Sequence, residues 1–273
     1  MHNRDMADGR AWIAEMGPKL AVQARLLRGL LAAVESDPRW EWLELGCSVA
    51  AGRGDALSDL DLALGHVGDA APPFVDVTSM LTGLGEVIDV SAQPWEGTPR
   101  WWVQYADGGQ IDLIMLPGAG RPGHAPGSVV LFDRHDRLGL SFTPRVLSAA
   151  PEEPRQWMLA GWEALSNAGK YLRRDSLFEA IEQLHQARGR ILQLWAVGER
   201  VTYPAFGLTS LLDDPAARVP DGLAGTYAVP ERASVLAAAL AAAELLRAAA
   251  SHAQQGLTTP LTEYVTANLR SVE

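Results

Sequence analysis

Residues 45–64 read LGCSVAAGRGDALSDLDLAL and contain the features that decide the fold of this chain. The apolar run just before them, residues 40–46, is bounded by proline and glycine and predicts a strand. A turn of small residues follows, with Ser48, Gly52 and Gly54. Glycine permits close approach of the backbone, and consecutive amides in such a turn can bind phosphate oxygens. This turn is therefore a candidate anion site.

Two acidic residues mark the next predicted strand. Asp59 and Asp61 flank Leu60, and the leucines at 60, 62 and 64 alternate with other residues. Side chains two residues apart on a strand share a face. Neighbouring carboxylates repel each other unless a cation lies between them, and hard oxygen ligands of this kind suit Mg²⁺. The alternative is that both are solvated acids at a strand edge.

Apolar patterning predicts the elements on either side of this stretch. Before residue 150 it indicates helices at 18–36 and 74–84, and further strands at 87–90, 101–105, 111–116 and 129–132. The Gly/Pro-rich run 117–127 is expected to be an exposed loop. After Pro151 the patterning predicts helices only, at 153–172, 176–196, 231–252 and 261–269, and Ser176 with Glu179 has the spacing of a capping box.

The fold class expected from this order is α+β. An N-terminal domain, residues 1–148, should contain a mixed sheet flanked by helices. A C-terminal domain, residues 149–273, should be a helical bundle.

Composition excludes several classes of protein. The 273 residues are 48% hydrophobic, which excludes a wholly disordered chain. Lys+Arg 23 against Asp+Glu 33 gives a net charge of -10. An acidic chain is a poor general binder of nucleic acid or of anionic membranes, whereas a cationic small molecule would be attracted to it.

Residue usage further predicts a cytoplasmic protein. Cys47 is the one cysteine, so no internal disulfide can form, as is common in a reducing compartment. Residues 1–12 lack the apolar core of a signal peptide. The most apolar stretch, 235–243, is shorter than the ~18 residues that a membrane span needs. We therefore expect no membrane partner.

The Gly/Ser turn followed by S-D-h-D resembles the signature of the DNA polymerase β-type nucleotidyltransferase superfamily. Within it, the stretch is most similar to the aminoglycoside and lincosamide nucleotidyltransferases, whose pattern is roughly G-S-x-A-R-G-x-x-D-x-x-S-D-h-D. The matching residues are Ser48, Ala50, Gly52, Asp55, Ser58, Asp59 and Asp61. Cys47 replaces the first glycine and Ala51 replaces the arginine, whose charge Arg53 could supply.

The resemblance also implies a third carboxylate on a neighbouring strand. Asp112 fits, because it is an acid within the apolar run I-D-L-I-M-L and would be costly to bury without a partner. In the helical half, residues 167–170 (N-A-G-K) resemble a segment of kanamycin nucleotidyltransferase in which the lysine contacts the nucleotide phosphates and a preceding glutamate is the general base. Lys170 matches the lysine, but Ser166 replaces the glutamate and the nearest upstream acid is Glu163. In related enzymes the third strand carboxylate is the base, which would give this role to Asp112.

The implied reaction transfers a nucleoside monophosphate from an NTP, by default ATP, to a hydroxyl of a small molecule such as an aminoglycoside, and releases pyrophosphate. Asp59, Asp61 and Asp112 would hold two Mg²⁺ ions. The nucleotide would contact Gly46, Cys47, Ser48, Arg53, Ser58 and Lys170. Acceptor contacts are expected from Trp101, Trp102 and Glu163, with Glu86, Trp95, Glu96, Glu179 and Glu182 as further candidates.

Some alternatives remain open at this point. Trp101 and Trp102 are neighbours on a strand, so one can pack inward while the other faces outward. The acceptor could instead be a protein or a tRNA, although a tRNA needs a basic patch and the net charge argues against one. The chain could also bind nucleotide as a regulator without catalysis, but three intact carboxylates argue against a decayed site.

Overall fold

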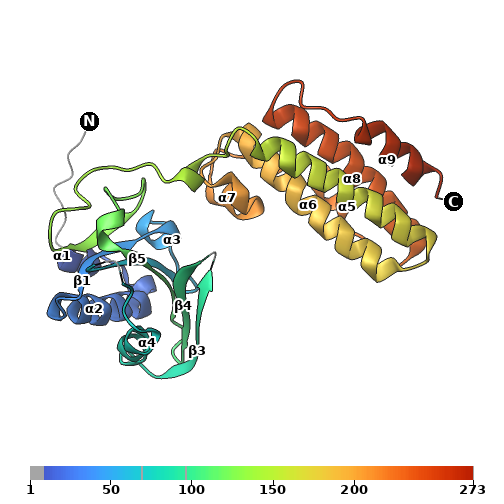
Figure 1. Ribbon diagram of the computed structural model, residues 1–273. Coiled ribbons are helices and arrows are strands. Elements are labelled where there is room, and N and C mark those ends of the chain that lie inside the picture. Colours follow the sequence, from blue (N-terminus) through green and yellow to red (C-terminus); the bar gives the residue numbers. More distant parts are fainter. Residues whose placement is uncertain (1–8, 69, 96, 273) are drawn as a thin grey trace. The chain divides into compact units, whose positions relative to one another are not determined.

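The computed structural model describes residues 9–68, 70–95 and 97–272. The chain divides into two compact units, Met1–Thr143 and Pro144–Glu273. Figure 1 shows that the first unit contains a sheet with helices and that the second is helical. The α+β class expected from the order of apolar patterns is confirmed. Residues 1–8 of the polar N-terminal segment lie outside the described residues.

Six strands of the first unit form one mixed sheet in the order β3-β4-β5-β2-β1-β6. Among the strand pairs that the structure describes, β2 and β5 are parallel and the others are antiparallel. The strands are β1 (Trp40–Leu45), β2 (Leu60–His66), β3 (Val87–Trp95), β4 (Thr98–Tyr105), β5 (Gln110–Pro117) and β6 (Val129–Asp133). The central position of β2 and β5 places the two acid-bearing segments side by side.

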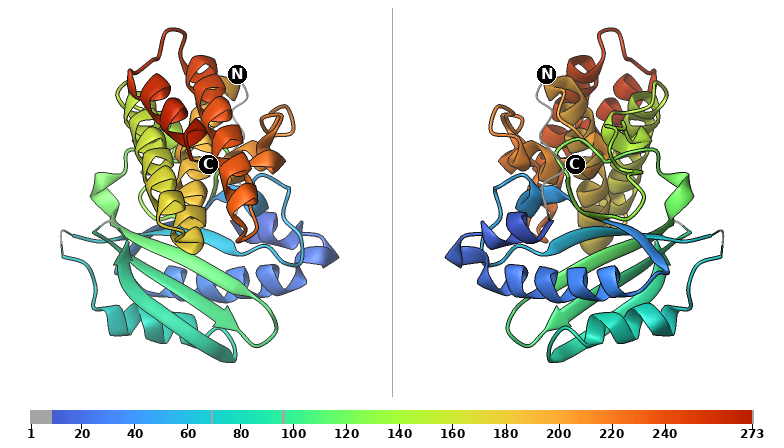
Figure 2. Two further views of the ribbon diagram at one scale, coloured as in Figure 1. Left: turned by 90° about the vertical axis from the view of Figure 1, so that its right-hand side faces the viewer. Right: turned by 90° about the vertical axis from the view of Figure 1, so that its left-hand side faces the viewer.

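The first unit has helices beside this sheet, and two of them cover one of its faces. The helices are α1 (Gly9–Ala14), α2 (Ala21–Ser36), the four-residue α3 (Cys47–Ala50) and α4 (Phe74–Thr82). Leucines at helical spacing on α2, among them Leu26 and Leu30, pack with Leu62 and Leu113 of the sheet, so that α2 and α4 lie against the same face (Figure 2). Because side chains alternate along a strand, the residues between these leucines, Asp61 among them, point to the opposite face.

Part of that opposite face is covered by the loop that follows β5. Trp42, Ala63 and Leu138 form a small cluster there. Glu44 holds the loop, since its carboxylate accepts a bond from the Ala125 amide at 2.8 Å and pairs with Arg121 at 2.5 Å. The expectation of an exposed loop at 117–127 was therefore wrong in part, because Gly118, Gly123 and Ala125 are buried.

The second unit is a bundle of helices with a largely alanine and leucine core. Its helices are α5 (Glu153–Arg173), α6 (Leu177–Glu199), α7 (Leu208–Asp213), α8 (Arg232–Ala253) and α9 (Leu261–Arg270). Small residues of α8, such as Ala239 and Ala242, are fully buried and allow close helix packing. Among the described helices α8 alone has the length and apolar composition of a membrane span, and half of its apolar window is buried in this unit, which also fits a core helix.

Two local predictions differ from the structure. The turn expected after Gly46 contains the short helix α3. The capping box at the start of α6 does not form, because the Ser176 hydroxyl donates to the Glu179 carboxylate and the cap has no side-chain hydrogen bond to the backbone. A carboxylate competes well for the hydroxyl proton because bonds to charged acceptors are the stronger ones.

Candidate functional site

Asp61 and Asp112 are directly paired across the parallel strands β2 and β5. The register Leu60↔Ile111 and Leu62↔Leu113 places the apolar neighbours of both acids in the core below the sheet. Both carboxylates consequently project from the same face, the one not covered by α2 and α4. The pairing brings together two acids that are 51 positions apart in the sequence and that were predicted to cooperate.

The environment of Asp61 favours its neutral form. Burial is the largest cause, and the nearby carboxylates of Asp59 and Asp112 add to it, so that the pKa of Asp61 rises to about 6 despite a hydrogen bond from Cys47 and the charge of Arg100. Partial burial among like charges is the condition that a bound cation relieves. The charged form of Asp61 would therefore be stabilised by a positive partner.

Asp59 lies at the entrance to β2, in a loop that helix α2 holds in place. The buried Gln23 side chain donates from Nε2 to the Ser58 carbonyl oxygen at 2.7 Å. Ser58 does not reach out of the loop: its hydroxyl accepts a bond from the Asp55 amide at 2.9 Å. Asp55 in turn accepts from the Leu57 amide at 2.9 Å. Ser58 and Asp55, which both belong to the sequence pattern, thus stabilise the turn that precedes Asp59.

The segment between β1 and β2 lies next to Asp61. The Gly46 amide donates to the Asp61 carbonyl oxygen at 2.8 Å, and Cys47, which follows, has a φ of 54°. This left-handed conformation favours glycine, which explains why a glycine is common in the pattern that this stretch resembles. Ser48 is half-buried on α3, whereas Arg53 is exposed in the loop beyond it.

Asp112 has an ion-pair partner that the sequence patterns did not single out. Arg100 of β4 donates from Nε to Oδ1 of Asp112 at 2.7 Å, and its Nη2 pairs with Oδ2. The hydrogen bond to Asp112, together with the negative charge of that carboxylate, holds the pKa of Arg100 above its usual range. The sequence could have pointed to Arg100 only through alternation along β4. Arg100 and Trp102 lie two residues apart on this strand, so their side chains share a face.

Within the described residues, no three His, Cys, Asp or Glu side chains are already arranged to hold a metal ion. The chemistry of the donors nevertheless fits Mg²⁺, since Asp59, Asp61 and Asp112 offer only carboxylate oxygens and interact electrostatically. Metal binding by Asp112 has a competitor in this arrangement, because Arg100 hydrogen-bonds both of its carboxylate oxygens.

The two adjacent tryptophans face opposite sides of the sheet. Trp101 is fully buried, its indole N–H donates to Thr78 Oγ1 at 3.1 Å, and its ring lies 4.7 Å from that of Phe74. The prediction that Trp101 contacts an acceptor is therefore wrong, because the core already surrounds it. Trp102 is half-buried and directly opposite Asp112, on the face that carries the acids.

Glu163 and Lys170 lie on α5 of the second unit. Together with Asn167 they occupy positions i, i+7 and i+4, which share one face of a helix, and Lys170 Nζ donates to Asn167 Oδ1 at 3.0 Å. Glu163 and Asn167 line a groove of about 470 Å³ between α5 and α6, with Gln183, His185, Gln186 and Arg190 as its other polar lining residues. This groove is rich in hydrogen-bonding groups.

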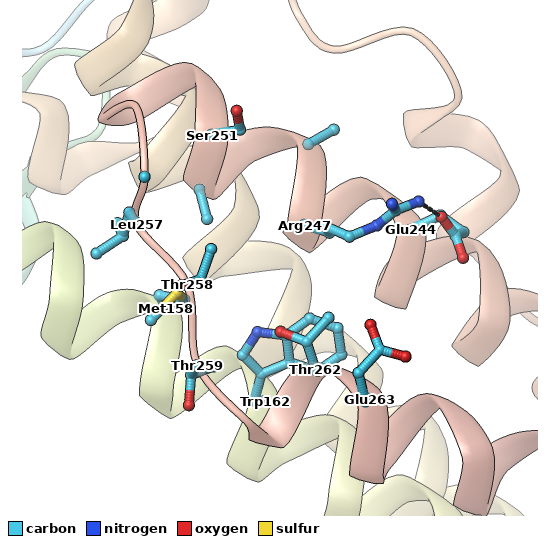
Figure 3. A pocket seen from close by; sticks show the side chains of 13 residues that line it. Met158, Trp162, Glu244, Arg247, Ser251, Leu257, Thr258, Thr259, Thr262 and Glu263 are labelled. Atoms are coloured by element: carbon cyan, nitrogen blue, oxygen red, sulfur yellow. Dashed lines mark hydrogen bonds and ion pairs between the residues drawn. The ribbon is translucent and has the colours of Figure 1, made fainter.

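A second cavity in this unit contains none of the predicted residues. It has a volume of about 530 Å³ and is lined by Trp162, Thr258, Thr262 and Glu263, among others (Figure 3). Arg247 lies across its wall and pairs with Glu244. The remaining acceptor candidates from the sequence do not line this cavity. Glu86, Trp95, Glu179 and Glu182 are exposed, and Glu96 lies outside the described residues.

Among known proteins, likeness to this chain is found in solved structures. No protein-family model matches the chain, and no curated protein matches it. The crystal structure of an aminoglycoside 6-adenyltransferase from Bacillus subtilis is similar over 94% of this chain and 99% of its own, with 14% identical residues and a TM-score of 0.41. At this level of similarity no residue role transfers, so the function must be argued from the site itself.

Proposed function

We propose that this chain is a nucleotidyltransferase. It transfers a nucleoside monophosphate, AMP from ATP, to a hydroxyl group of a small aminoglycoside-type molecule. The acceptor oxygen forms a bond to the α-phosphorus while the bond from that phosphorus to the bridging oxygen breaks, and pyrophosphate leaves. The observation that carries the proposal is the pairing of Asp61 with Asp112 on adjacent parallel strands, with Asp59 at the entrance to the same strand.

The three carboxylates are the proposed metal ligands. Asp59, Asp61 and Asp112 would hold two Mg²⁺ ions, and the carboxylate oxygens of this group support that assignment. When bound, Mg²⁺ offsets the charge of the triphosphate and lowers the pKa of the acceptor hydroxyl. Asp112 is the proposed proton acceptor, and Glu163 is the second candidate for that role. Positioning and charge stabilisation are the main demands of phosphoryl transfer.

The nucleotide phosphates are assigned to the segment between β1 and β2. The Gly46 amide and the Cys47 side chain both hydrogen-bond Asp61, and Ser48 follows them on α3. Arg53 is the proposed source of positive charge in this segment, and Lys170 of the second unit remains a proposed nucleotide contact. The Ser58 hydroxyl is already bonded within its own loop, so its proposed role is to shape the turn. Trp102, half-buried beside Asp112, is the proposed apolar contact on this face.

The acceptor is proposed to be hydroxylated and to carry amino groups. The groove that contains Glu163 supports a polar acceptor, because its polar lining consists of this carboxylate, three amides, one imidazole and the Arg190 guanidinium, with few apolar side chains. Ammonium groups can donate to such acceptors, and the net charge of -10 favours a cationic molecule over nucleic acid.

A pyrophosphate-release screen tests the proposal. The purified chain is incubated with Mg²⁺, each of the four NTPs and a panel of aminoglycosides and lincosamides, and products are identified by mass spectrometry. Asp59→Asn, Asp61→Asn and Asp112→Asn should each lower turnover at least 1,000-fold, on the order of the loss seen when key electrostatic groups are removed. Asp89→Asn is the matched control, because Asp89 is an exposed acid on β3 of the same sheet.

The outcomes separate the remaining possibilities. Adduct formation with an added mass of one nucleoside monophosphate supports the proposal. Nucleotide binding by calorimetry without release of pyrophosphate for any acceptor in the panel indicates a regulator instead. If Glu163→Gln abolishes the pH dependence of turnover and Asp112→Asn does not, Glu163 is the base. Retained turnover in Asp59→Asn contradicts the assigned metal site.

A further inference from the structure

The Arg100–Asp112 pair engages both oxygens of one of the three carboxylates. Nε and Nη2 of the guanidinium each bind a different oxygen of Asp112, so a metal ion that approaches this carboxylate meets a positive charge already bound to it. The side chains remain 35% and 21% exposed, respectively. A partly exposed pair is weakly held compared with a buried one, so a competing cation can replace the arginine.

The position of Arg100 follows from the strand register. Trp102 lies directly opposite Asp112, and Arg100 lies opposite Ile114, two residues farther along β5. This diagonal relationship on one face is within the reach of a long side chain. Arg100 therefore supplies a positive charge that contacts Asp112 directly, on the face of the sheet that also carries Asp61.

A divalent cation and a guanidinium at the same carboxylate repel each other, because both are positively charged. Once Asp112 turns to a metal, Arg100 needs another anionic partner. The planar fork of arginine matches phosphate as well as it matches carboxylate, and the proposed reaction brings a triphosphate to this face.

We propose that Arg100 is a displaceable counter-ion. It blocks Asp112 in the free protein, and it pairs with a phosphate oxygen of the incoming nucleotide when Asp112 becomes a metal ligand. This inference rests on the proposed function and adds a positioning residue to it. Its physical consequence is that metal binds to Asp112 together with nucleotide and poorly without it.

Mn²⁺ binding in the absence of nucleotide tests the first half of the inference. The affinity is measured at pH 7.5 by electron paramagnetic resonance for wild type, Arg100→Gln and Arg100→Lys. Arg100→Gln should bind Mn²⁺ about fivefold more tightly, because the competing pair is gone. Arg100→Lys keeps the charge but loses the fork, so its affinity should lie between the other two. Arg25→Gln is the matched control, since Arg25 pairs with Asp107 at 2.7 Å in the same unit.

The second half is tested by the KM for Mg-ATP in the pyrophosphate assay. Arg100→Gln should raise it at least tenfold, whereas Arg25→Gln should not change it. An unchanged KM overturns the assignment of Arg100 to a phosphate. Unchanged Mn²⁺ affinity in Arg100→Gln, in a protein whose wild type transfers nucleotide, overturns the counter-ion inference alone.

Two further results are decisive. Absence of Mn²⁺ binding in Arg100→Gln overturns the inference, whereas the proposed function is decided separately by the pyrophosphate-release screen. If Arg100→Gln fails to fold, as judged by its melting curve, Arg100→Lys answers the question, and an Mn²⁺ affinity equal to that of wild type overturns the inference.

Discussion

Gln23 of α2 donates from Nε2 to the Ser58 carbonyl oxygen at 2.7 Å, and this bond joins the helical layer to the loop that carries Asp59. Gln23 is 1% exposed, and the same nitrogen lies 3.4 Å from the Ala56 carbonyl oxygen. A buried amide that serves loop carbonyls restricts the loop to one conformation. The position of the first metal carboxylate thus depends on a residue more than 30 positions upstream of it.

Gln23→Leu should weaken Mn²⁺ binding severalfold and lower the free energy of unfolding by about 1–3 kcal/mol, the cost of leaving a buried carbonyl without a partner. Both quantities are measured on the same samples, by metal titration and by urea unfolding. Gln193→Leu is the control, because Gln193 makes a comparable bond to the Ala205 carbonyl oxygen at 2.8 Å in the second unit. If Gln23→Leu loses stability but retains full metal affinity, the bond does not position Asp59.

Asp61→Asn should stabilise the metal-free protein, and the gain should depend on pH. The pKa of Asp61 is raised to about 6 in the folded chain from 3.8, so the folded state binds more protons than the unfolded state between these values. Stability is therefore lost as pH rises from 4 to 6, and the penalty is fully present above pH 6. The gain should be about 1–3 kcal/mol at pH 7.5 and below about 1 kcal/mol at pH 4.

Urea unfolding at both pH values, without divalent metal, measures this difference. Asp89→Asn serves as the reference for a carboxylate on the same sheet that is exposed. Equal effects of Asp61→Asn at pH 7.5 and pH 4 would show that burial and the neighbouring acids do not act on this residue as described.

Replacement of the two tryptophans should separate stability from binding. Trp101→Ala empties a fully buried site and should lower the free energy of unfolding by about 3–5 kcal/mol. Trp102→Ala removes a half-buried side chain and should cost less than half as much, while raising the KM for nucleotide or acceptor. Unfolding curves and steady-state kinetics are compared for both variants. A kinetic defect in a stable Trp101→Phe variant that exceeds the defect of Trp102→Phe would reverse these assignments.

Two glycines should respond to alanine in opposite directions. An added Cβ at Gly65 of β2 would lie 2.2 Å from the Trp42 ring, so Gly65→Ala should destabilise the first unit by about 1–3 kcal/mol through overpacking. Gly189 lies within α6 with no atom within 4 Å of the added Cβ, and Gly189→Ala should stabilise the chain by about 0.5–1 kcal/mol. Melting temperatures of the two variants should move apart, and a loss of stability in Gly189→Ala would contradict this.

Much of the fold was predictable because it rests on local periodicity. Helical spacing of leucines predicted α2, and alternation around Leu60 predicted β2, since both patterns reflect one buried face of a single element. The role of Asp112 could be predicted only through the family resemblance of the preceding motif. An acid within an apolar run needs a partner, but the sequence of the run does not show which residue that partner is. Arg100 had no such motif, and its alternation with Trp102 was the available indication.

The sequence by itself determined the order of elements, the acid pair Asp59 and Asp61 on either side of Leu60, and the negative charge that disfavours nucleic acid. Only Asp61 lies on β2, whereas Asp59 was expected on the strand and lies in the loop before it. The tertiary structure alone decided that β5 lies beside β2 and that Arg100 forms an ion pair with Asp112. It also decided that Trp101 is buried in the core and that Gln23 hydrogen-bonds the loop before Asp59. The physical reason is that periodicity is a property of neighbouring residues. Strand order and side-chain pairing depend on contacts between distant segments, which form only when the whole sheet is assembled.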